Sequence, residues 1–306
     1  TVYRGNLFVG DLLLNESGMQ NHPLTPMRDA NLVRTLQRQS RSPVGLLRYD
    51  VVQRGVAAVN DARAQLMKGG VRLAIADAIS DADLYTLGEA CAGDLLVTGG
   101  SGLALGLPGN FARAGRLDTA NDAQQLPAVM GRSVVLAGSC SRATQAQVAH
   151  WRDSGKPAFR LDPLALADDE QRVIDDALAF ARQRIDHEPV LIYATSAPEE
   201  VASVQQTLGT AASGELVERA LASIARGVEA MGVRRFVVAG GETSGSVVNA
   251  LRVTSLVIGP QIDPGVPWTV SDGARHALAL KSGNFGTVDF FEKALAQFDR
   301  IAESSR

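Results

Sequence analysis

Short apolar runs rich in β-branched residues alternate with segments of helical period along most of this 306-residue chain. In its first part, the runs Val44–Leu47, Arg72–Ala76 and Leu95–Thr98 are typical of strands. Parallel strands need a long crossover, usually a helix, because each connection must return the chain to the same end of the sheet. The alternation therefore predicts an α/β fold built on parallel sheets.

Helical periods fill the intervals between these runs. Asp29 precedes the first helical segment, where its carboxylate is expected to cap the free N–H groups of the first turn. Gly69 and Gly70 are expected to end the second helix. The expected helices are Asp29–Arg38, Val56–Met67, Asp83–Cys91, Arg142–Arg152, Asp168–Arg184, Gly214–Met231, Ser246–Leu251 and Val288–Ile301.

The chain is long for a single domain, and its pattern breaks once. Between Gly109 and Arg132 the sequence is a mixture of Gly, Asn, Asp, Gln and Pro, which is typical of a connection between domains. We expect a first domain over 1–116, a linker over 117–132 and a second domain over 133–306. The strands expected in the second domain are Ser133–Ala137, Ala158–Leu161, Val190–Tyr193, Arg235–Ala239, Leu256–Ile258 and Ala277–Lys281.

Composition excludes several classes of function. With 33 acidic against 30 basic residues, the chain lacks the basic excess that binding to nucleic-acid phosphates demands. The uncharged stretch Leu95–Ala112 contains five glycines and a proline, so no membrane span is expected. Cys91 and Cys140 match no disulfide or zinc pattern, and the four histidines show no metal-binding spacing. A cytoplasmic protein without a structural metal is the prediction.

Four glycine-rich turns follow expected strands, at the carboxyl ends where ligands gather in open parallel sheets. Each offers close backbone approach, N–H groups at a helix start and side-chain hydroxyls, which together suit an anion. Three of the four belong to the second domain, which favours a phosphate-bearing ligand there. None matches the Walker or the dinucleotide-binding pattern. The turns are Gly99–Gly102, Gly138–Arg142, Gly240–Gly245 and Ser282–Gly286.

Two nucleophile hypotheses compete with this interpretation. Cys140 follows a strand, but a phosphatase loop of the C-x5-R kind would need arginine where Ala146 stands, so a small core cysteine is favoured. Gly241–Gly245 also resembles a nucleophile elbow with threonine in place of serine, followed by Asp263, Asp272 and His276. These acids and the histidine follow too closely for the usual insertions of that fold, so a ligand-binding loop explains the hydroxyls more simply.

The segment Asn15–Met27 has neither helical nor strand period and concentrates polar residues around two prolines. It is either an ordered functional loop or a rigid surface loop. Within it, His22 is a candidate for binding a sugar hydroxyl or a carboxylate, although a histidine before proline is as often a capping or packing residue.

Taken together, several motifs in order along the chain resemble the four-carbon acid sugar kinase family. The loop Asn15–Met27 most resembles the branch that acts on 3-oxo-tetronate, while other branches phosphorylate threonate or erythronate. The motifs are Asn15–Met19, His22–Met27, Gly138–Ser141, Gly240–Gly245, Gly259–Pro260, Asp263–Trp268 and Leu280–Gly286.

The resemblance implies two Rossmann-like parallel-sheet domains with an interdomain cleft. It implies transfer of the γ-phosphoryl group of ATP, with Mg²⁺, to the terminal 4-hydroxyl of a four-carbon sugar acid, and a homodimer remains one hypothesis for assembly. For the acid, the candidates are His22, Gly99, Gly100 and Ser101. For ATP, the residues that carry over are Ser139, Ser141, Gly240, Gly241, Glu242, Thr243, Gly283 and Asn284.

One family motif is absent. The substrate domain of the family opens with an acidic A-D-D-x-T-G-A loop, and no such motif occurs between Thr1 and Arg306. We therefore expect the first domain to be truncated, and no catalytic residue is assigned. The alternative to a kinase of 3-oxo-tetronate is a nucleotide-binding module without turnover, or a threonate or erythronate kinase.

Overall fold

The computed structural model describes residues 1–21, 25–117, 125–196 and 198–304. Contacts between residues group the chain into two compact units, Thr1–Asn121 and Asp122–Arg306. This division lies inside the segment expected to link two domains. The interdomain cleft stays a prediction.

A seven-stranded sheet organises the described part of the second unit, in the order β10-β11-β12-β9-β6-β8-β7. The five strands from β12 to β7 are parallel, which confirms the predicted α/β architecture. The two at the other edge are antiparallel, so a purely parallel sheet is wrong. The strands are β6 (Arg132–Ala137), β7 (Ala158–Arg160), β8 (Val190–Tyr193), β9 (Val233–Ala239), β10 (Leu256–Asp263), β11 (Val266–Ser271) and β12 (Ala277–Lys281).

The antiparallel edge is a hairpin between β10 and β11. Asp263 pairs with Val266 across its turn, and Gly265 has a φ of +79°, a conformation that glycine adopts readily. No strand was expected at β11, and Pro267 within it is a residue that strands rarely contain. A proline is tolerated there since the pairing is irregular on either side of Gln261.

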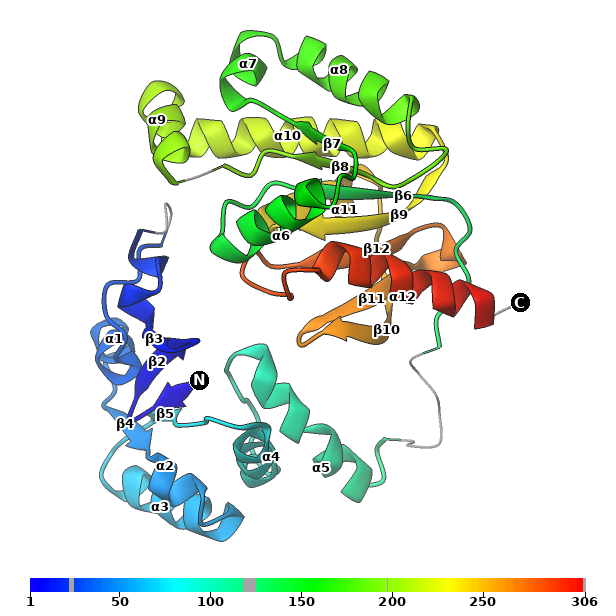
Figure 1. The fold of residues 1–306 in the computed structure, drawn as a ribbon. Helices are drawn as coiled ribbons and strands as arrows, with labels where there is room; N and C mark the ends of the chain where they lie inside the picture. Colours follow the sequence, from blue (N-terminus) through cyan, green and yellow to red (C-terminus); the bar gives the residue numbers. More distant parts are fainter. Residues whose placement is uncertain (22–24, 118–124, 197, 305–306) are drawn as a thin grey trace. The chain divides into compact units, whose positions relative to one another are not determined.

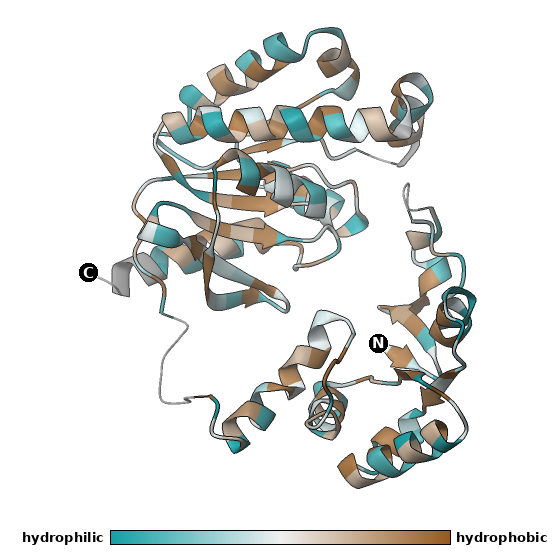
Figure 2. Cartoon of the chain, turned by 180° about the vertical axis from the view of Figure 1, so that it is seen from behind, coloured by the Kyte–Doolittle hydropathy of each residue, from teal (hydrophilic) through white to brown (hydrophobic). Residues whose placement is uncertain are grey.

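Helices cover both faces of this sheet, because alternate residues of each strand point to opposite sides. On β6, Val134 and Leu136 face one core, while Val135 and Ala137 face the other. The first core includes residues of α7 (Pro163–Asp168), α8 (Glu170–Arg182), α10 (Thr210–Ala230) and α11 (Gly241–Ala250); the second includes residues of α6 (Arg142–Asp153) and α12 (Phe290–Ser304). Figure 2 shows the strands between these helices as hydrophobic along most of their length.

The helices of this unit differ from the prediction at three places. The expected helix Asp168–Arg184 corresponds to α8, which begins at Glu170 because Asp169 is its N-cap and accepts a hydrogen bond from the backbone N–H of Arg172. Helix α7, which precedes it, was not expected. Helix α11 begins at Gly241, five residues before the expected start at Ser246, so most of the expected glycine-rich loop is helical. Helix α9 (Pro198–Leu208) was not expected.

The first unit combines a small antiparallel sheet with a parallel strand pair (Figure 1). The parallel pair confirms two expected strands, but the antiparallel sheet is not part of a Rossmann-like pattern. The elements are β1 (Val2–Tyr3), β2 (Asn6–Val9), β3 (Leu12–Leu13), η1 (Leu14–Glu16), η2 (Met19–Asn21), α1 (Leu32–Gln39), β4 (Val44–Leu47), α2 (Tyr49–Val52), α3 (Val56–Lys68), β5 (Leu73–Ala76), α4 (Asp81–Ala90), η3 (Ser101–Gly106) and α5 (Pro108–Arg113).

Buried Asp77 joins the two sheets of this unit. It follows β5, and its carboxylate accepts hydrogen bonds from the backbone N–H groups of Arg4, Gly5 and Tyr49. Because a buried carboxylate must be satisfied by donors, these three bonds hold the β1–β2 turn and the start of α2 against the end of β5.

Three local expectations for the first unit are wrong. Leu95–Thr98 is not a strand, and the side chain of Leu95 is fully exposed. The N-cap of α1 is Asn31, while Asp29 binds arginines of that helix. Helix α5 occupies the start of the region expected to lack structure. Within the described residues, no helix is both long and apolar enough to cross a bilayer.

Candidate phosphate-binding site

Three loops of the second unit lie together where β6, β9 and β12 end. These strands are parallel neighbours, so their carboxyl ends share one edge of the sheet. A Cβ atom added to Gly138 would lie 2.3 Å from Thr243 Oγ1, and one added to Gly283 would lie 2.3 Å from Ser139 Oγ. A side chain at either position would displace these hydroxyls, so glycine lets the loops approach closely.

Helix α11 presents its N-terminus at this edge. Gly240 is its N-cap, with a φ of +136°, and the carbonyl of Gly240 accepts hydrogen bonds from the backbone N–H and the hydroxyl of Ser244. The first N–H groups of a helix have no acceptor within it and suit an anion. A Cβ added to the exposed Gly241 would meet no atom within 4 Å, so the space in front of this turn is open.

Ser141 and Ser139 have different positions in the loop after β6. The Ser141 hydroxyl caps α6 by accepting from the N–H of Thr144, and it donates to the carbonyl of Gly283 at 2.5 Å. Ser141 therefore ties two of the loops together. The Ser139 hydroxyl accepts from the N–H of Ser141 at 3.2 Å, and Thr195 donates to the Ser139 carbonyl.

Buried Lys281 supports the loop after β12. It is 1% exposed, and its ammonium donates to Thr144 Oγ1 and the Gly283 carbonyl, each at 2.9 Å, and to the Ser282 carbonyl at 3.2 Å. Burial lowers its pKa to about 8, because the charged form loses hydration. Three oxygen acceptors retain the ammonium there at neutral pH.

Lys281, Thr144 and Gln147 were not expected from the sequence to be site residues. Gln147 is also buried, and its amide donates to the carbonyls of Phe285, Gly286 and Thr287 in the same loop. The available signal was weak: polar residues three apart on the helix that follows β6, and a lysine that ends an apolar strand.

The structure brings together the residues expected to bind ATP. Gly240, Gly241 and Thr243 lie at the start of α11, and Glu242 is exposed on the same turn. Asn284 is exposed next to Gly283 in the loop after β12. Whether each contacts nucleotide stays a prediction.

The residues expected to bind the acid are not assembled into a site. His22 lies outside the described residues. Gly99, Gly100 and Ser101 belong to the first unit, where they are exposed immediately before or at the start of η3. Their role in substrate binding stays a prediction.

The geometry does not favour the nucleophile hypotheses. Burial, and then the charge of Glu200, raise the pKa of the Cys140 thiol, which disfavours the reactive thiolate. Asp263 is bound by Thr287 and Lys293, whereas His276 is bound by Glu229. Asp263 and His276 therefore have separate partners and do not form a catalytic relay. Among the described residues, no group of three His, Cys, Asp or Glu side chains is arranged to hold a metal ion.

Comparisons with known proteins agree with this arrangement. Residues 1–107 match a family described as the sugar-binding N-terminal domain, and residues 134–291 match the nucleotide-binding C-terminal domain. The candidate phosphate-binding loops all lie in the second of these ranges.

Two bacterial relatives named 3-oxo-tetronate kinase align with nearly the whole chain. The protein of Burkholderia multivorans is 65% identical, over 99% of this chain and 70% of its own length. That of Cupriavidus necator is 63% identical, over 97% of this chain and 68% of its own length. These shares do not establish that the first domain is truncated.

A solved structure supports the fold. A Salmonella typhimurium LT2 protein, described provisionally as a tRNA synthase, is 37% identical, with a TM-score of 0.77 over 97% of this chain and 70% of that one. The identities, the two matched domains and the ordered motifs lead to one assignment: this chain belongs to the four-carbon acid sugar kinase family.

Proposed function

We propose that this protein transfers the γ-phosphoryl group of ATP to the terminal 4-hydroxyl of 3-oxo-tetronate. The relatives named 3-oxo-tetronate kinase support this substrate, since they share more than three fifths of their aligned residues with the chain. The observation that carries the kinase assignment is the meeting of three glycine-bearing loops around the open N-terminus of α11.

The residues at this edge fit the phosphates of ATP. The free N–H groups at the start of α11 and the helix dipole attract negative charge. The open space beside Gly241 leaves room for phosphate oxygens, and Ser139 adds a hydroxyl from the neighbouring loop. Mg²⁺ would enter with the nucleotide and supply charge neutralisation there.

Phosphoryl transfer demands alignment and charge stabilisation more than covalent help from the protein. In this proposal the α11 amides hold the phosphates, while Lys281, Thr144 and Ser141 fix the position of the Gly283 loop through its carbonyl. Backbone donors of this kind are pre-organised by the sheet, so they need no rearrangement when the nucleotide binds. The residue that accepts the hydroxyl proton is unassigned.

Substitution of Gly241 tests the phosphate site. Because a Cβ at this position meets no protein atom, Gly241→Val should fold normally but occupy the space that the phosphates require. Calorimetry should show at least a tenfold weaker affinity for ATP–Mg²⁺. Gly214→Val, at another exposed and open glycine, is the matched control and should bind as wild type. Unchanged affinity in Gly241→Val would contradict the site.

A coupled ADP-release assay separates the proposed activity from its alternatives. Turnover with 3-oxo-tetronate, faster than with threonate or erythronate, is the expected result. Faster turnover with either of those acids would reassign the substrate. ATP binding without turnover on any of the three would favour a nucleotide-binding module, the hypothesis motivated by the absent acidic motif.

We also propose a cytoplasmic location, which suits an ATP-dependent enzyme with two free cysteines, Cys91 and Cys140. A homodimer stays a prediction.

A further inference from the structure

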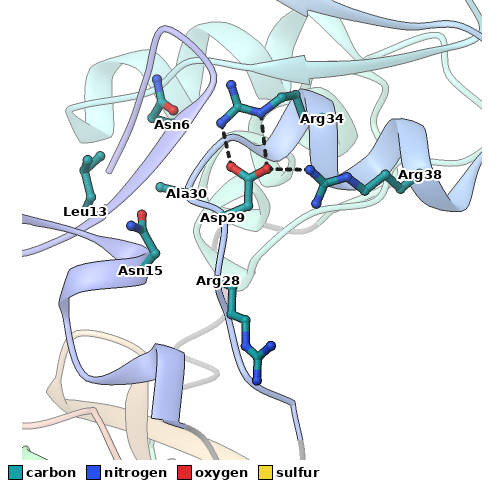
Figure 3. A pocket seen from close by; sticks show the side chains of 8 residues that line it. All are labelled: Asn6, Leu13, Asn15, Arg28, Asp29, Ala30, Arg34 and Arg38. Carbon is teal, nitrogen blue, oxygen red and sulfur yellow. Dashed lines mark hydrogen bonds and ion pairs between the residues drawn. The ribbon is translucent and has the colours of Figure 1, made fainter.

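A pocket of about 390 Å³ opens within the first unit, and its lining includes Asn15 from the loop Asn15–Met27. The antiparallel sheet, η1, the segment before α1, and α1 itself contribute to its lining. Figure 3 shows its polar side chains, which come from segments separated in the sequence. They are Asn6, Asn15, Arg28, Asp29, Arg34 and Arg38.

The lining carries three guanidinium groups and one carboxylate, an excess of two positive charges. Asp29 accepts hydrogen bonds from Arg34 Nη2 at 2.7 Å and Arg34 Nε at 3.2 Å, and it lies 3.3 Å from Arg38 Nη2. The hydrogen bond from Arg34, and then that from the Asn31 N–H, lower the pKa of Asp29 to about 2. The pocket therefore keeps its charge throughout the physiological pH range.

Asp29 orients the arginines without using all their donors. A guanidinium has five N–H groups, and the recorded bonds to Asp29 use one or two nitrogen atoms of each arginine. Arg34 and Arg38 are four residues apart on α1, so both side chains point from the same face of the helix. Arg28, from the segment before α1, also lines the pocket, and Figure 3 shows its guanidinium directed away from Asp29.

We propose that this pocket binds the carboxylate of the four-carbon sugar acid. Asp29 uses the Nε and Nη2 side of Arg34, and the remaining N–H groups of the guanidiniums can donate to a second carboxylate. The amides of Asn6 and Asn15 offer both donors and acceptors to the hydroxyl and oxo groups of the same small molecule. The volume is in the range of small-molecule sites. This inference rests on the proposed function for the identity of the acid.

Single arginine substitutions test the pocket in the ADP-release assay. Arg28→Gln, Arg34→Gln and Arg38→Gln should each raise KM for the acid about tenfold, while KM for ATP stays within twofold. Arg34→Lys keeps the charge but loses the fork, so it should lie between wild type and Arg34→Gln. Arg41→Gln, at an exposed arginine outside the lining, is the control and should match wild type.

Folding is checked by thermal melting of each variant. Arg28→Gln leaves the Asp29 ion pairs with Arg34 and Arg38 intact. This variant therefore still tests the pocket if loss of those ion pairs destabilises α1. If Arg28→Gln, Arg34→Gln and Arg38→Gln all fold and all keep the wild-type KM for the acid, the pocket is not the carboxylate site, although the kinase activity would stand.

Calorimetry without ATP tests acid binding to the pocket independently of turnover. Threonate and erythronate should bind wild type and lose about tenfold affinity in Arg34→Gln, whereas uncharged erythrulose should bind neither protein. Arginine-dependent acid binding without any phosphorylation would keep the site and reject the proposed function. Tighter binding of inorganic phosphate than of any acid, with the same arginine dependence, would overturn the carboxylate assignment, as would the absence of acid binding to wild type.

Discussion

Lys281 illustrates how burial alters the chemistry of a single side chain. Its ammonium is enclosed among oxygen atoms of Thr144, Ser282 and Gly283, and its pKa is about 8 rather than the ordinary 10.5. In the unfolded chain the same lysine is hydrated, so the folded protein binds its proton less tightly. Protein stability must therefore depend on pH through this residue.

The direction of that dependence follows from proton linkage. Below pH 8 both states are protonated and the folded state bears the full cost of burying a charge. Between pH 8 and 10.5 the unfolded chain keeps a proton that the folded chain has released, so the free energy of unfolding rises with pH. Relative to Lys281→Met, wild type should gain on the order of 3 kcal/mol across this window. Urea unfolding of both proteins, measured at several pH values, checks this, and a constant difference between them would contradict it.

Other single residues were predictable to different degrees. Glycines at Gly240, Gly241 and Gly283 were identified from the sequence because loops that approach a phosphate closely exclude side chains. Lys281 was not proposed as a site residue, since a lysine is ordinarily expected at the surface. Its burial depends on α6, which supplies Thr144 from a different part of the chain.

At the scale of elements, Asp263 connects the β10–β11 hairpin to the segment before α12. The carboxylate is 3% exposed; it accepts from the N–H and hydroxyl of Thr287, at 2.8 and 2.9 Å, and from the Lys293 ammonium. Burial raises its pKa, but the hydrogen bonds from Lys293 and Thr287 outweigh burial and leave the pKa below the ordinary 3.8. The charged form therefore stabilises this junction.

Removing that charge should weaken the second unit. Asp263→Asn should lower the free energy of unfolding by about 3 kcal/mol at pH 7, because Lys293 and Thr287 lose a charged acceptor. The depressed pKa means that this contribution is present above pH 3.8 and is lost as pH falls through the folded-state pKa. Chemical denaturation at pH 7 and below 4 measures both effects. Asp153→Asn, at an exposed aspartate, should change stability by less than about 0.5 kcal/mol, and an equal loss in both variants would reject the role of the junction.

Most of the helices and strands could be predicted from local periodicity. The elements that could not be predicted carry competing local signals. The strands Val134–Ala137 and Val190–Tyr193 lie in expected runs, because burial on both faces requires continuous apolar sequence. Strand β11 contains a proline, and its place in the sheet depends on pairing with β10 and β12. That pairing on both sides outweighs the local signal of the proline.

At the scale of the whole molecule, substrate and nucleotide functions are expected in different units. In the first unit, α4 and η3 pack so closely that a Cβ on Gly88 would lie 2.4 Å from the Cα of Gly106. That contact is with backbone, so rotation of a side chain cannot relieve it. The side chain of Asn110 also donates to the Gly88 carbonyl at 2.7 Å.

Disrupting this packing should separate the two functions. Gly88→Val should abolish ADP release in the presence of the acid, while calorimetry should show ATP–Mg²⁺ affinity within twofold of wild type. Gly93→Val, where a Cβ meets nothing within 4 Å, should retain both properties. If Gly88→Val lost ATP affinity as well, nucleotide binding would depend on the first unit, contrary to the prediction.

The sequence by itself determined the α/β class, the glycine-bearing loops of the candidate phosphate-binding site and the family, because periodicity, glycine positions and ordered motifs are local properties of the chain. Only the tertiary structure decided that Lys281 is buried, that β10 and β11 form an antiparallel edge, and that Asp29 organises an arginine pocket rather than capping α1. Each of these depends on which distant or competing groups come within hydrogen-bonding reach after the chain folds. That choice is set by packing and desolvation over the whole unit, and a local pattern does not specify it.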